Sequence, residues 1–328
     1  MAVRGPPLVE TRVRYFNEEY RHGSGELTYS KASRHTITAP HNVRLHDGRA
    51  LPNDGLQQLH ERGFCLTSFH VPGLHENLDE FLLNPPGIRG DHEDKGPGPP
   101  LAEETRKGLY RAGAGLAKRF LGARYAFAMS HTCRRGNKGH TDGASYVTSY
   151  ATFAHCDYTK RIVDADASWR TLVQFGVPEA EAKQMEVGYY NIWQPTNVPV
   201  QQNPLALVDW GTVDEDEDVR PVKLGHTSGY PKKSSDDGDS SQKDAYVPMI
   251  TLLAPAPERH KWYYYPQLRP DEALIFSQVD GRSDRRTYTF HTAVVDPNGP
   301  PQEEAVARHN YELRLLCAWP KGPRHAKL

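Results

Sequence analysis

The sequence predicts a mainly β protein with flanking helices, built around a double-stranded β-helix, the jelly-roll or cupin-like architecture. Three observations predict this fold. Beyond residue 122, short β-favouring runs recur between turns rich in glycine and proline, which is typical of sandwiches and barrels. The clearest helical period lies before that point. Two of the later runs end in histidine, and a double-sheet jelly roll is the variant that frames a ligand pocket.

Composition limits the classes of protein that fit. The 328 residues suffice for one large core, and the 40 basic and 41 acidic residues nearly cancel, so nucleic acid is not an expected partner. No apolar run approaches the roughly 18 residues of a membrane span, and the N-terminus lacks the apolar segment of a secretory signal. The four cysteines form no Cys-x-x-Cys pair, so neither a zinc ribbon nor a disulfide framework is indicated. We therefore expect a soluble, cytoplasmic protein with reduced cysteines.

The first part of the chain is expected to be an extension followed by helices. Residues 1–45 have too little apolar content to close a core, so we expect them to lie over a single domain that spans 46–328. Its helical part covers 46–122. A short helix is expected to begin at a cap formed by Asn53-Asp54 and to end at Arg62, because Gly63 suits the left-handed residue that follows a helix.

A longer helix is expected over residues 102–121. Apolar residues recur there at steps of three and four, which gives one apolar face for core packing. The segment 87–100 before it is rich in glycine and proline and is expected to be a loop.

The jelly-roll core is expected over residues 123–320. Pro178 suits the first position of a helix over 178–187. Residues 213–245 are polar enough to be a mobile insertion or lid. The strands expected in this part are 124–130, 144–154, 189–194, 205–210, 249–254, 262–265, 273–278, 288–293 and 311–319.

One β-favouring run ends in His155-Cys156-Asp157, which has the pattern of a metal site. Residues two apart on a strand project to the same side, so a strand end can offer both ligands. Two imidazoles and a carboxylate can occupy one face of octahedral Fe(II) and leave three positions for a chelating cosubstrate and dioxygen. His-x-Asp also occurs at His92 and His140, but in loop-like segments, and metal ligands need rigid elements. The alternative is a histidine and an aspartate hydrogen-bonded at a strand end.

The third ligand and a cosubstrate contact are expected later in the chain. His291 ends another β-favouring run, and strands distant in sequence lie side by side in a jelly roll; a purely structural histidine is the alternative. The apolar strand after it carries Arg308 and Arg314, and buried charge needs a partner. A dicarboxylate cosubstrate offers one, because guanidinium binds carboxylate in a bidentate fork. Alternatively Glu312 pairs internally with one arginine, which suits Arg314 better than Arg308.

An ordered series of blocks resembles the CmcJ/AsaB-like family of fungal and bacterial oxygenases, which includes gibberellin desaturase. The resemblance spans about residues 45–320, and its strength lies in the order of the blocks. The blocks are Asp47–Arg49, Gly63–Phe64, His131–Arg135, His155–Thr159, Tyr190–Pro195, Asn203–Asp209, His260–Pro266, Asp271–Phe276, His291–Ala293, Asp296–Pro297 and Arg308–Arg314.

The resemblance implies a jelly-roll dioxygenase that uses Fe(II), 2-oxoglutarate and O2, with the iron ligands His155, Asp157 and His291. It implies an enzyme of secondary metabolism that activates a substrate C–H bond for hydroxylation, desaturation or ring closure, with aziridine formation on an amino acid among the outcomes. Which outcome applies depends on substrate placement and is left open by the sequence.

The resemblance also suggests cosubstrate contacts. Arg308 stands where the family has an Arg-x-Ser that resembles the cosubstrate clamp of related oxygenases, with Asn310 in place of the serine. Arg314 and Asn191 are further candidates for the cosubstrate site. The family commonly has arginine where this chain has Gln194, a departure that bears on substrate identity.

The substrate is expected to be a small molecule, carboxylate-bearing or an amino acid. The candidate contacts are Arg134, Arg135 and Arg161, which suit an anion, and Trp193. Two other functions stay open. A cupin-like metal-dependent isomerase or hydrolase would not need 2-oxoglutarate, and a non-enzymatic jelly-roll binding module would not bind Fe(II). The sequence leaves the oligomeric state open.

Overall fold

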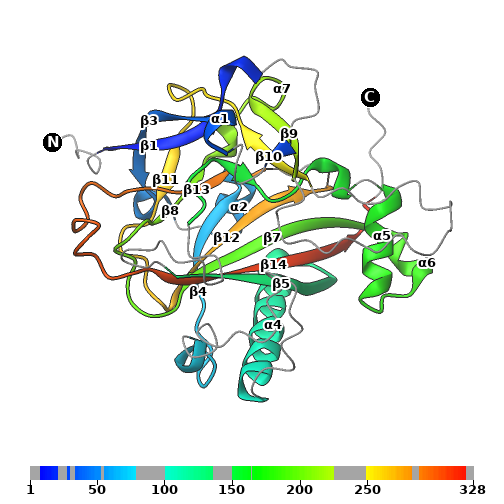
Figure 1. Cartoon of the computed structure of the whole chain (residues 1–328). Coiled ribbons are helices and arrows are strands. Elements are labelled where there is room, and N and C mark those ends of the chain that lie inside the picture. Colours follow the sequence, from blue (N-terminus) through cyan, green and yellow to red (C-terminus); the bar gives the residue numbers. More distant parts are fainter. Residues whose placement is uncertain are drawn as a thin grey trace, which may run out of the picture.

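Two β-sheets packed face to face form the body of the protein (Figure 1). A computed structural model describes residues 8–20, 28–29, 34–52, 55–78, 100–135, 150–163, 165–224, 249–282 and 288–322. The larger sheet contains β1 (Val9–Phe16), β3 (Thr38–Asp47), β11 (Trp262–Tyr264), β8 (Leu205–Val208), β13 (His291–Ala293), β6 (His155–Cys156), β10 (Met249–Leu253), β9 (Val219–Leu224) and β2 (Thr28–Tyr29), in that spatial order. The smaller sheet has the order β4 (Phe64–Ser68), β12 (Glu272–Asp280), β7 (Met185–Pro195), β14 (His309–Pro320) and β5 (Tyr125–Arg135). The predicted mainly β jelly-roll core is therefore confirmed.

Helices cover the outside of this core. They are α1 (Arg34–Ile37), α2 (Leu56–Arg62), α4 (Pro100–Leu121), α5 (Ala165–Gln174), α6 (Glu179–Ala182) and α7 (Glu215–Asp218). Short 3-10 turns occur at η1 (Glu18–Tyr20), η2 (Gly48–Ala50), η3 (His75–Asn77), η4 (Lys160–Val163) and η5 (Trp210–Thr212). In Figure 1, α4 lies beneath β5 and β14, and its apolar face packs on the outer surface of the smaller sheet.

Both helices expected before residue 123 are confirmed. Of the predicted apolar stripe on α4, Leu109 is fully buried, and Ala112, Leu116 and Phe120 pack partly buried against the same core cluster. Gly63 follows α2 with φ 91°, the left-handed conformation that glycine adopts without strain. The residues expected to begin that helix, 53–54, lie outside the described part of the chain.

Five segments differ from expectation. The helix expected over 178–187 stops at Ala182, because β7 begins at Met185 to pair with β12 and β14. Helix α5 was not predicted, since it is only ten residues long and its larger apolar residues are Trp169, Leu172 and Val173, of which Leu172 is fully buried. Of the strand expected over 144–154, the described residues 150–154 form a single bridge, between Phe153 and Arg14.

The fourth difference concerns the boundaries of the polar insertion. Its first residues form α7 and then β9, whose Val219 and Val222 are buried against β10. Residues 225–248 lie outside the described chain.

The boundary expected after residue 45 falls inside β3, which pairs with both β1 and β11 and so ties the N-terminal strands to the larger sheet.

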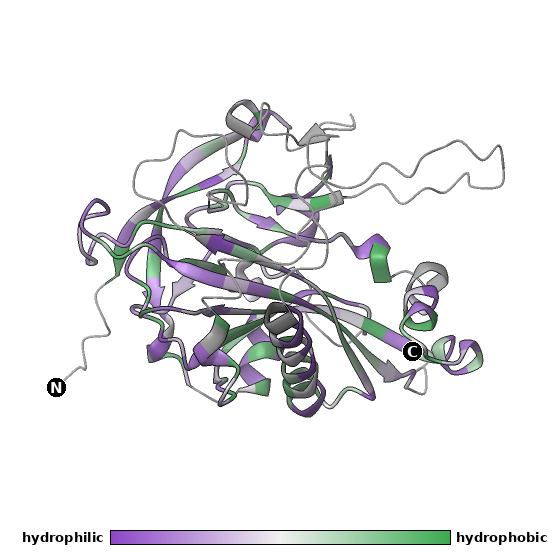
Figure 2. Cartoon of the chain, turned by 60° about the horizontal axis from the view of Figure 1, so that its bottom comes forward, coloured by the Kyte–Doolittle hydropathy of each residue, from purple (hydrophilic) through white to green (hydrophobic). Residues whose placement is uncertain are grey.

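The interior is not uniformly apolar. Figure 2 shows hydrophilic as well as hydrophobic stretches along strands in the middle of the molecule. Buried polar residues include His155, Asn191, Gln278, His291 and Glu312. Buried polar groups need partners, so this cluster indicates a built site rather than packing alone. The four cysteines are buried and unbridged, and no helix among the described residues is long and apolar enough to cross a membrane.

Candidate metal centre

The strand order of the larger sheet brings the three expected ligands together. His155 lies on β6, Asp157 follows it, and His291 begins β13, where it pairs directly with His155. One ligand atom from each residue lies within 4.8 Å of the others. His155 Nε2 is 3.6 Å from Asp157 Oδ1, and the two imidazole centroids are 4.4 Å apart. Neighbouring strands thus present two histidines and a carboxylate to one point.

Backbone carbonyls orient both imidazoles. His155 Nδ1 donates to the Phe153 carbonyl at 2.9 Å, and His291 Nδ1 lies 3.4 Å from the Thr289 carbonyl. A carbonyl only accepts, so each Nδ1 carries the proton and each Nε2 keeps its lone pair. His291 Nε2 is buried and has no hydrogen-bond partner among the described residues. Two such nitrogens and one carboxylate are the donor set that suits Fe(II), so the residues fit this metal.

The electrostatics keep the three groups in the protonation states that metal ligands require. Burial lowers the pKa of His155 to about 4, and it also lowers the pKa of His291. Burial alone would raise the pKa of Asp157, but the Arg314 guanidinium beside it brings that pKa below its usual range. At neutral pH the imidazoles are therefore neutral and the carboxylate is ionised.

Side chains behind Asp157 hold it in place. Its Oδ2 accepts from Arg314 Nε at 2.9 Å and from Asn191 Nδ2 at 3.2 Å. Its backbone N–H donates to Gln278 Oε1 at 2.7 Å, and the Cys156 thiol donates to the same oxygen at 2.9 Å. The Cys156 side chain is therefore engaged away from the ligand atoms.

Arg308 is a buried cation with aromatic neighbours. It is 2% exposed, and its guanidinium lies 3.9 Å from the Tyr150 ring centroid and 5.2 Å from that of Trp193. Nε donates to Asn310 Oδ1 at 2.9 Å, and Nη1 donates to the Asn203 carbonyl. No carboxylate of the described chain forms an ion pair with it, and burial lowers its pKa to about 9. A carboxylate ligand would offset the cost of this buried charge.

Arg314 and Asn191 have a different place from the one expected of cosubstrate contacts. The Arg314 guanidinium pairs with Asp157 and lies 3.2 Å from Glu312 Oε1, while Nη1 donates to Thr132 Oγ1. Asn191 Nδ2 donates to both carboxylates. The N–H donors of both residues are therefore engaged by the protein, whereas Asn191 Oδ1 is buried without a hydrogen-bond partner among the described residues. The expected cosubstrate role of the two residues stays a prediction. The internal pairing of Arg314 with Glu312, kept open above, is the arrangement observed.

Comparison with known proteins identifies the family. The family model described as YDMC: Oxidoreductase/YMDC permease-like domain matches residues 13–318. The chain belongs to this oxidoreductase family. Its relatives include the hydroxylase/desaturase asaB of Aspergillus flavus, 33% identical over 135 residues that cover 40% of this chain and 56% of that protein. The Fe(II)/2-oxoglutarate-dependent dioxygenase nvfI of Aspergillus novofumigatus is 26% identical over 280 residues, 84% of this chain and 83% of that protein.

A solved structure supports the same assignment of fold. The iron and alpha-ketoglutarate-dependent endoperoxidase NvfI superimposes with a TM-score of 0.69 at 22% identity, over 97% of this chain and 100% of that chain. The resemblance to the CmcJ/AsaB-like oxygenases is thus confirmed. The expected enzyme class, non-haem iron 2-oxoglutarate-dependent dioxygenase, and its cofactors Fe(II), 2-oxoglutarate and O2 are confirmed at the level of the family.

The four expected substrate contacts lie in different settings. Trp193 is 1% exposed and packs beside Arg308. Arg134, on β5, is close enough to the site to add to the effect of burial in lowering the pKa of His291 and Arg308. Arg161 is exposed on η4. The side chain of Arg135 lies outside the described residues.

Gln194 lies on the face of β7 that points away from the ligands. Successive side chains of a strand alternate, so Asn191 and Trp193 share one face and Gln194 lies on the other. Its amide donates to the Phe69 and Pro270 carbonyls at 2.6 and 2.7 Å, and its oxygen accepts from the Tyr311 hydroxyl. At this departure from the family pattern, Gln194 therefore binds neighbouring backbone and side-chain groups on the face of the sheet that points away from the candidate ligands.

Sequence reasoning missed Gln278, which holds Cys156 and the backbone of Asp157, the two residues that follow His155. Its carbonyl and side-chain oxygens both accept from Cys156 Sγ at 2.9 Å, in addition to the bond from Asp157 N. The available signal was a glutamine at the end of the apolar run 273–278, because an amide that is fully buried in a strand needs polar partners.

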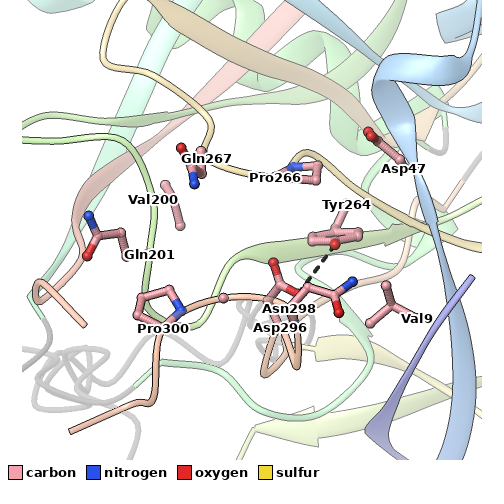
Figure 3. Close-up of a pocket in the computed structure, with 11 residues that line it drawn as sticks. Val9, Asp47, Val200, Gln201, Tyr264, Pro266, Gln267, Asp296, Asn298 and Pro300 are labelled. Atoms are coloured by element: carbon pink, nitrogen blue, oxygen red, sulfur yellow. Dashed lines mark hydrogen bonds between the residues drawn. The ribbon is translucent and has the colours of Figure 1, made fainter. Parts of the chain in front are cut away.

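A separate pocket lies elsewhere on the molecule (Figure 3). It has a volume of about 240 Å³, and the Tyr264 hydroxyl in its wall donates to Asp296 at 3.4 Å. Val200 and Gln267 line the opposite part in the same view. Its lining contains none of the three candidate ligands, so this pocket is not the metal centre.

Proposed function

We propose that this protein uses His155, Asp157 and His291 to hold Fe(II) and that it oxidises a C–H bond of a small molecule of secondary metabolism, by hydroxylation, desaturation or ring closure. One observation carries the proposal: the three ligand atoms lie within 4.8 Å of one another, with His291 Nε2 buried and unpartnered among the described residues. Family membership supports it.

The protein's own residues bind and orient the reactants. His155 and His291 present Nε2, because the carbonyls of Phe153 and Thr289 hold their Nδ1 protons. With Asp157 they would hold Fe(II) through three protein atoms, and the other coordination positions would be free for 2-oxoglutarate and O2. Bound Fe(II), 2-oxoglutarate and O2 supply the oxidising chemistry.

Arg308 is proposed to bind the distal carboxylate of 2-oxoglutarate. Its buried position beside Tyr150 and Trp193 excludes water and strengthens a charge-assisted hydrogen bond. An isomerase or hydrolase on the same ligands would have no need for this cation, so Arg308 favours the oxygenase over that alternative.

The substrate is proposed to carry a carboxylate, an amino acid being one candidate, with aziridine formation among the possible ring closures. The positive charge of Arg134 near His291 supports an anionic substrate. Candidate compounds can be added to the anaerobic complex with Fe(II) and 2-oxoglutarate while its charge-transfer absorption is followed. If amino acids leave the band unmoved while terpenoids shift it, the proposed substrate class is wrong.

The deciding experiment measures iron binding and succinate formation. Protein reconstituted anaerobically with Fe(II) and 2-oxoglutarate should form succinate when oxygen is admitted, at a slow uncoupled rate if no substrate is present. His155→Ala and His291→Ala should lower both iron affinity and succinate formation at least tenfold, since each removes a ligand.

His70→Ala is the matched control, because the His70 side chain is 48% exposed and lies outside the cluster. It should bind iron and form succinate as the wild type does. Wild-type protein that binds no Fe(II) would overturn the proposed function and favour the binding-module alternative.

A further inference from the structure

We propose that Arg314, together with Asn191, is a positioning residue that fixes Asp157 as a one-oxygen ligand and thereby keeps a metal position open for 2-oxoglutarate. The inference rests on the proposed function, because it concerns how this chain holds Fe(II). It assigns a role to two residues that the sequence had suggested as cosubstrate contacts.

The two oxygens of Asp157 have different surroundings. Oδ2 accepts two hydrogen bonds, from Arg314 Nε at 2.9 Å and from Asn191 Nδ2 at 3.2 Å. Oδ1 faces the other ligands, 3.6 Å from His155 Nε2. The hydrogen bonds therefore hold one oxygen away from the metal and present the other.

The two donors are themselves fixed. Arg314 on β14 and Asn191 on β7 are direct partners in the antiparallel register. Glu312 Oε1 accepts from Asn191 Nδ2 at 2.8 Å and lies 3.2 Å from Arg314 Nη2. Thr132 on β5 accepts from Arg314 Nη1 at 2.7 Å. Three adjacent strands thus lock a planar guanidinium, and a guanidinium with several engaged donors has little freedom to turn.

This arrangement has a chemical consequence for the metal. Three ligands that each supply one atom leave three of six octahedral positions, two for 2-oxoglutarate and one for O2. A carboxylate with both oxygens free can bind a metal through both. If Oδ2 were released, Asp157 would compete for a position that 2-oxoglutarate needs. Arg314 would then affect 2-oxoglutarate binding without touching it.

The test compares Arg314→Met with Arg314→Lys in the full-length protein. Fe(II) is titrated anaerobically, and 2-oxoglutarate is then titrated at saturating Fe(II) with the charge-transfer absorption as readout. Arg314→Met should raise the Kd for Fe(II) about 10- to 100-fold, the usual effect of losing a residue that orients a ligand. It should also weaken 2-oxoglutarate binding at saturating Fe(II), and Arg314→Lys should restore part of both losses.

Arg282→Met is the matched control for general destabilisation. Arg282 also pairs with a buried carboxylate, Asp280 at 2.7 Å, and its guanidinium lies 3.5 Å from the Trp319 ring centroid. Loss of this pair should lower the melting temperature but leave both dissociation constants within about twofold. Asn191→Ala removes one hydrogen-bond donor to Asp157 instead of a charge. It should raise the Kd values for Fe(II) and 2-oxoglutarate by a smaller factor than Arg314→Met does. This variant keeps the test informative if Arg314→Met does not fold.

The outcomes separate the inference from the proposed function. If Arg314→Met and Asn191→Ala bind Fe(II) and 2-oxoglutarate as the wild type does, the positioning role is overturned while the iron site stands. Equal weakening by Arg282→Met would also overturn it, because the effect would then be general. If wild-type protein binds no Fe(II), the proposed function itself fails.

Discussion

At the scale of single residues, one face of β14 and the residue before it organise the polar interior. Arg308, Asn310, Glu312 and Arg314 are two residues apart, so their side chains share a face. Asn310 holds Arg308, and Glu312 lies against Arg314. The two arginines therefore have separate partners: Arg314 pairs with a proposed metal ligand, and Arg308 is placed for a ligand carboxylate.

Replacing Arg308 should weaken 2-oxoglutarate binding while leaving iron binding intact. Arg308→Lys keeps the positive charge but cannot bind a carboxylate through two parallel hydrogen bonds, so we expect the KM for 2-oxoglutarate to rise about tenfold. Arg308→Met should raise it at least about a hundredfold, since a buried charge-assisted bond contributes about 3 kcal/mol. Steady-state succinate formation measures both. Arg44→Met, at an exposed arginine of β3, is the control. An unchanged KM in Arg308→Met would favour the isomerase or hydrolase alternative.

At the scale of elements, the end of α2 is connected to the strand that carries His291. The Gly63 carbonyl accepts from Thr289 Oγ1 and from Ser277 N, both at 2.8 Å. Thr289 in turn offers its carbonyl to His291 Nδ1. A Cβ at Gly63 would lie 2.2 Å from Thr289 Oγ1, closer than atoms can approach. The helix end thus packs directly on residues that orient a proposed ligand.

Gly63→Ala should destabilise the protein more than an alanine at another left-handed glycine. We expect a loss of about 2–4 kcal/mol in the free energy of unfolding, from backbone strain of about 1–2 kcal/mol plus the clash with Thr289. Gly122→Ala is the matched control, because Gly122 has φ 63° with open space around its Cβ position, and should cost about 1–2 kcal/mol. Urea denaturation measures both. Equal losses in the two variants would show that Thr289 moves aside without cost.

At the scale of the whole molecule, α4 packs on the smaller sheet partly through a histidine. His131 on β5 is joined to Tyr110 on α4 by a 2.9 Å hydrogen bond, and burial lowers the His131 pKa from 6.5 to about 4. Between pH 6.5 and pH 4, His131 therefore binds a proton in the unfolded chain but stays neutral in the folded protein. The stabilisation from neutral His131 is complete above pH 6.5 and is lost as the pH falls toward 4.

His131→Gln should flatten the dependence of stability on pH. Each pH unit in this window corresponds to about 1.4 kcal/mol per histidine, so His131 should account for a loss of about 2 kcal/mol between pH 6.5 and pH 5. Urea unfolding of metal-free protein at pH 7 and pH 5 gives the slope for wild type and variant. A residual slope is expected in the variant, because the pKa of His155 is lowered in the same direction. Identical slopes in the two proteins would contradict a buried neutral His131.

Local patterns predicted much of the fold and the candidate ligands. Helix α4, the left-handed Gly63 and most strands of the core follow from periodicity and turn residues, because these signals act between near neighbours. The His155–Asp157 pair was recognisable for the same reason, as two ligands on one strand end. Helix α5 was not predicted, because its ten residues are too few to show a helical period clearly.

By itself the sequence determined the β-rich class, the family resemblance and a short set of ligand and arginine candidates. Only the tertiary structure decided how these combine: β13 pairs with β6 so that His291 meets His155, Arg314 pairs with Asp157, and Arg308 is buried without a carboxylate of the described chain. The physical reason is that strand order and register join residues far apart in the chain. The partner of a buried charge follows from that register, which no local pattern contains.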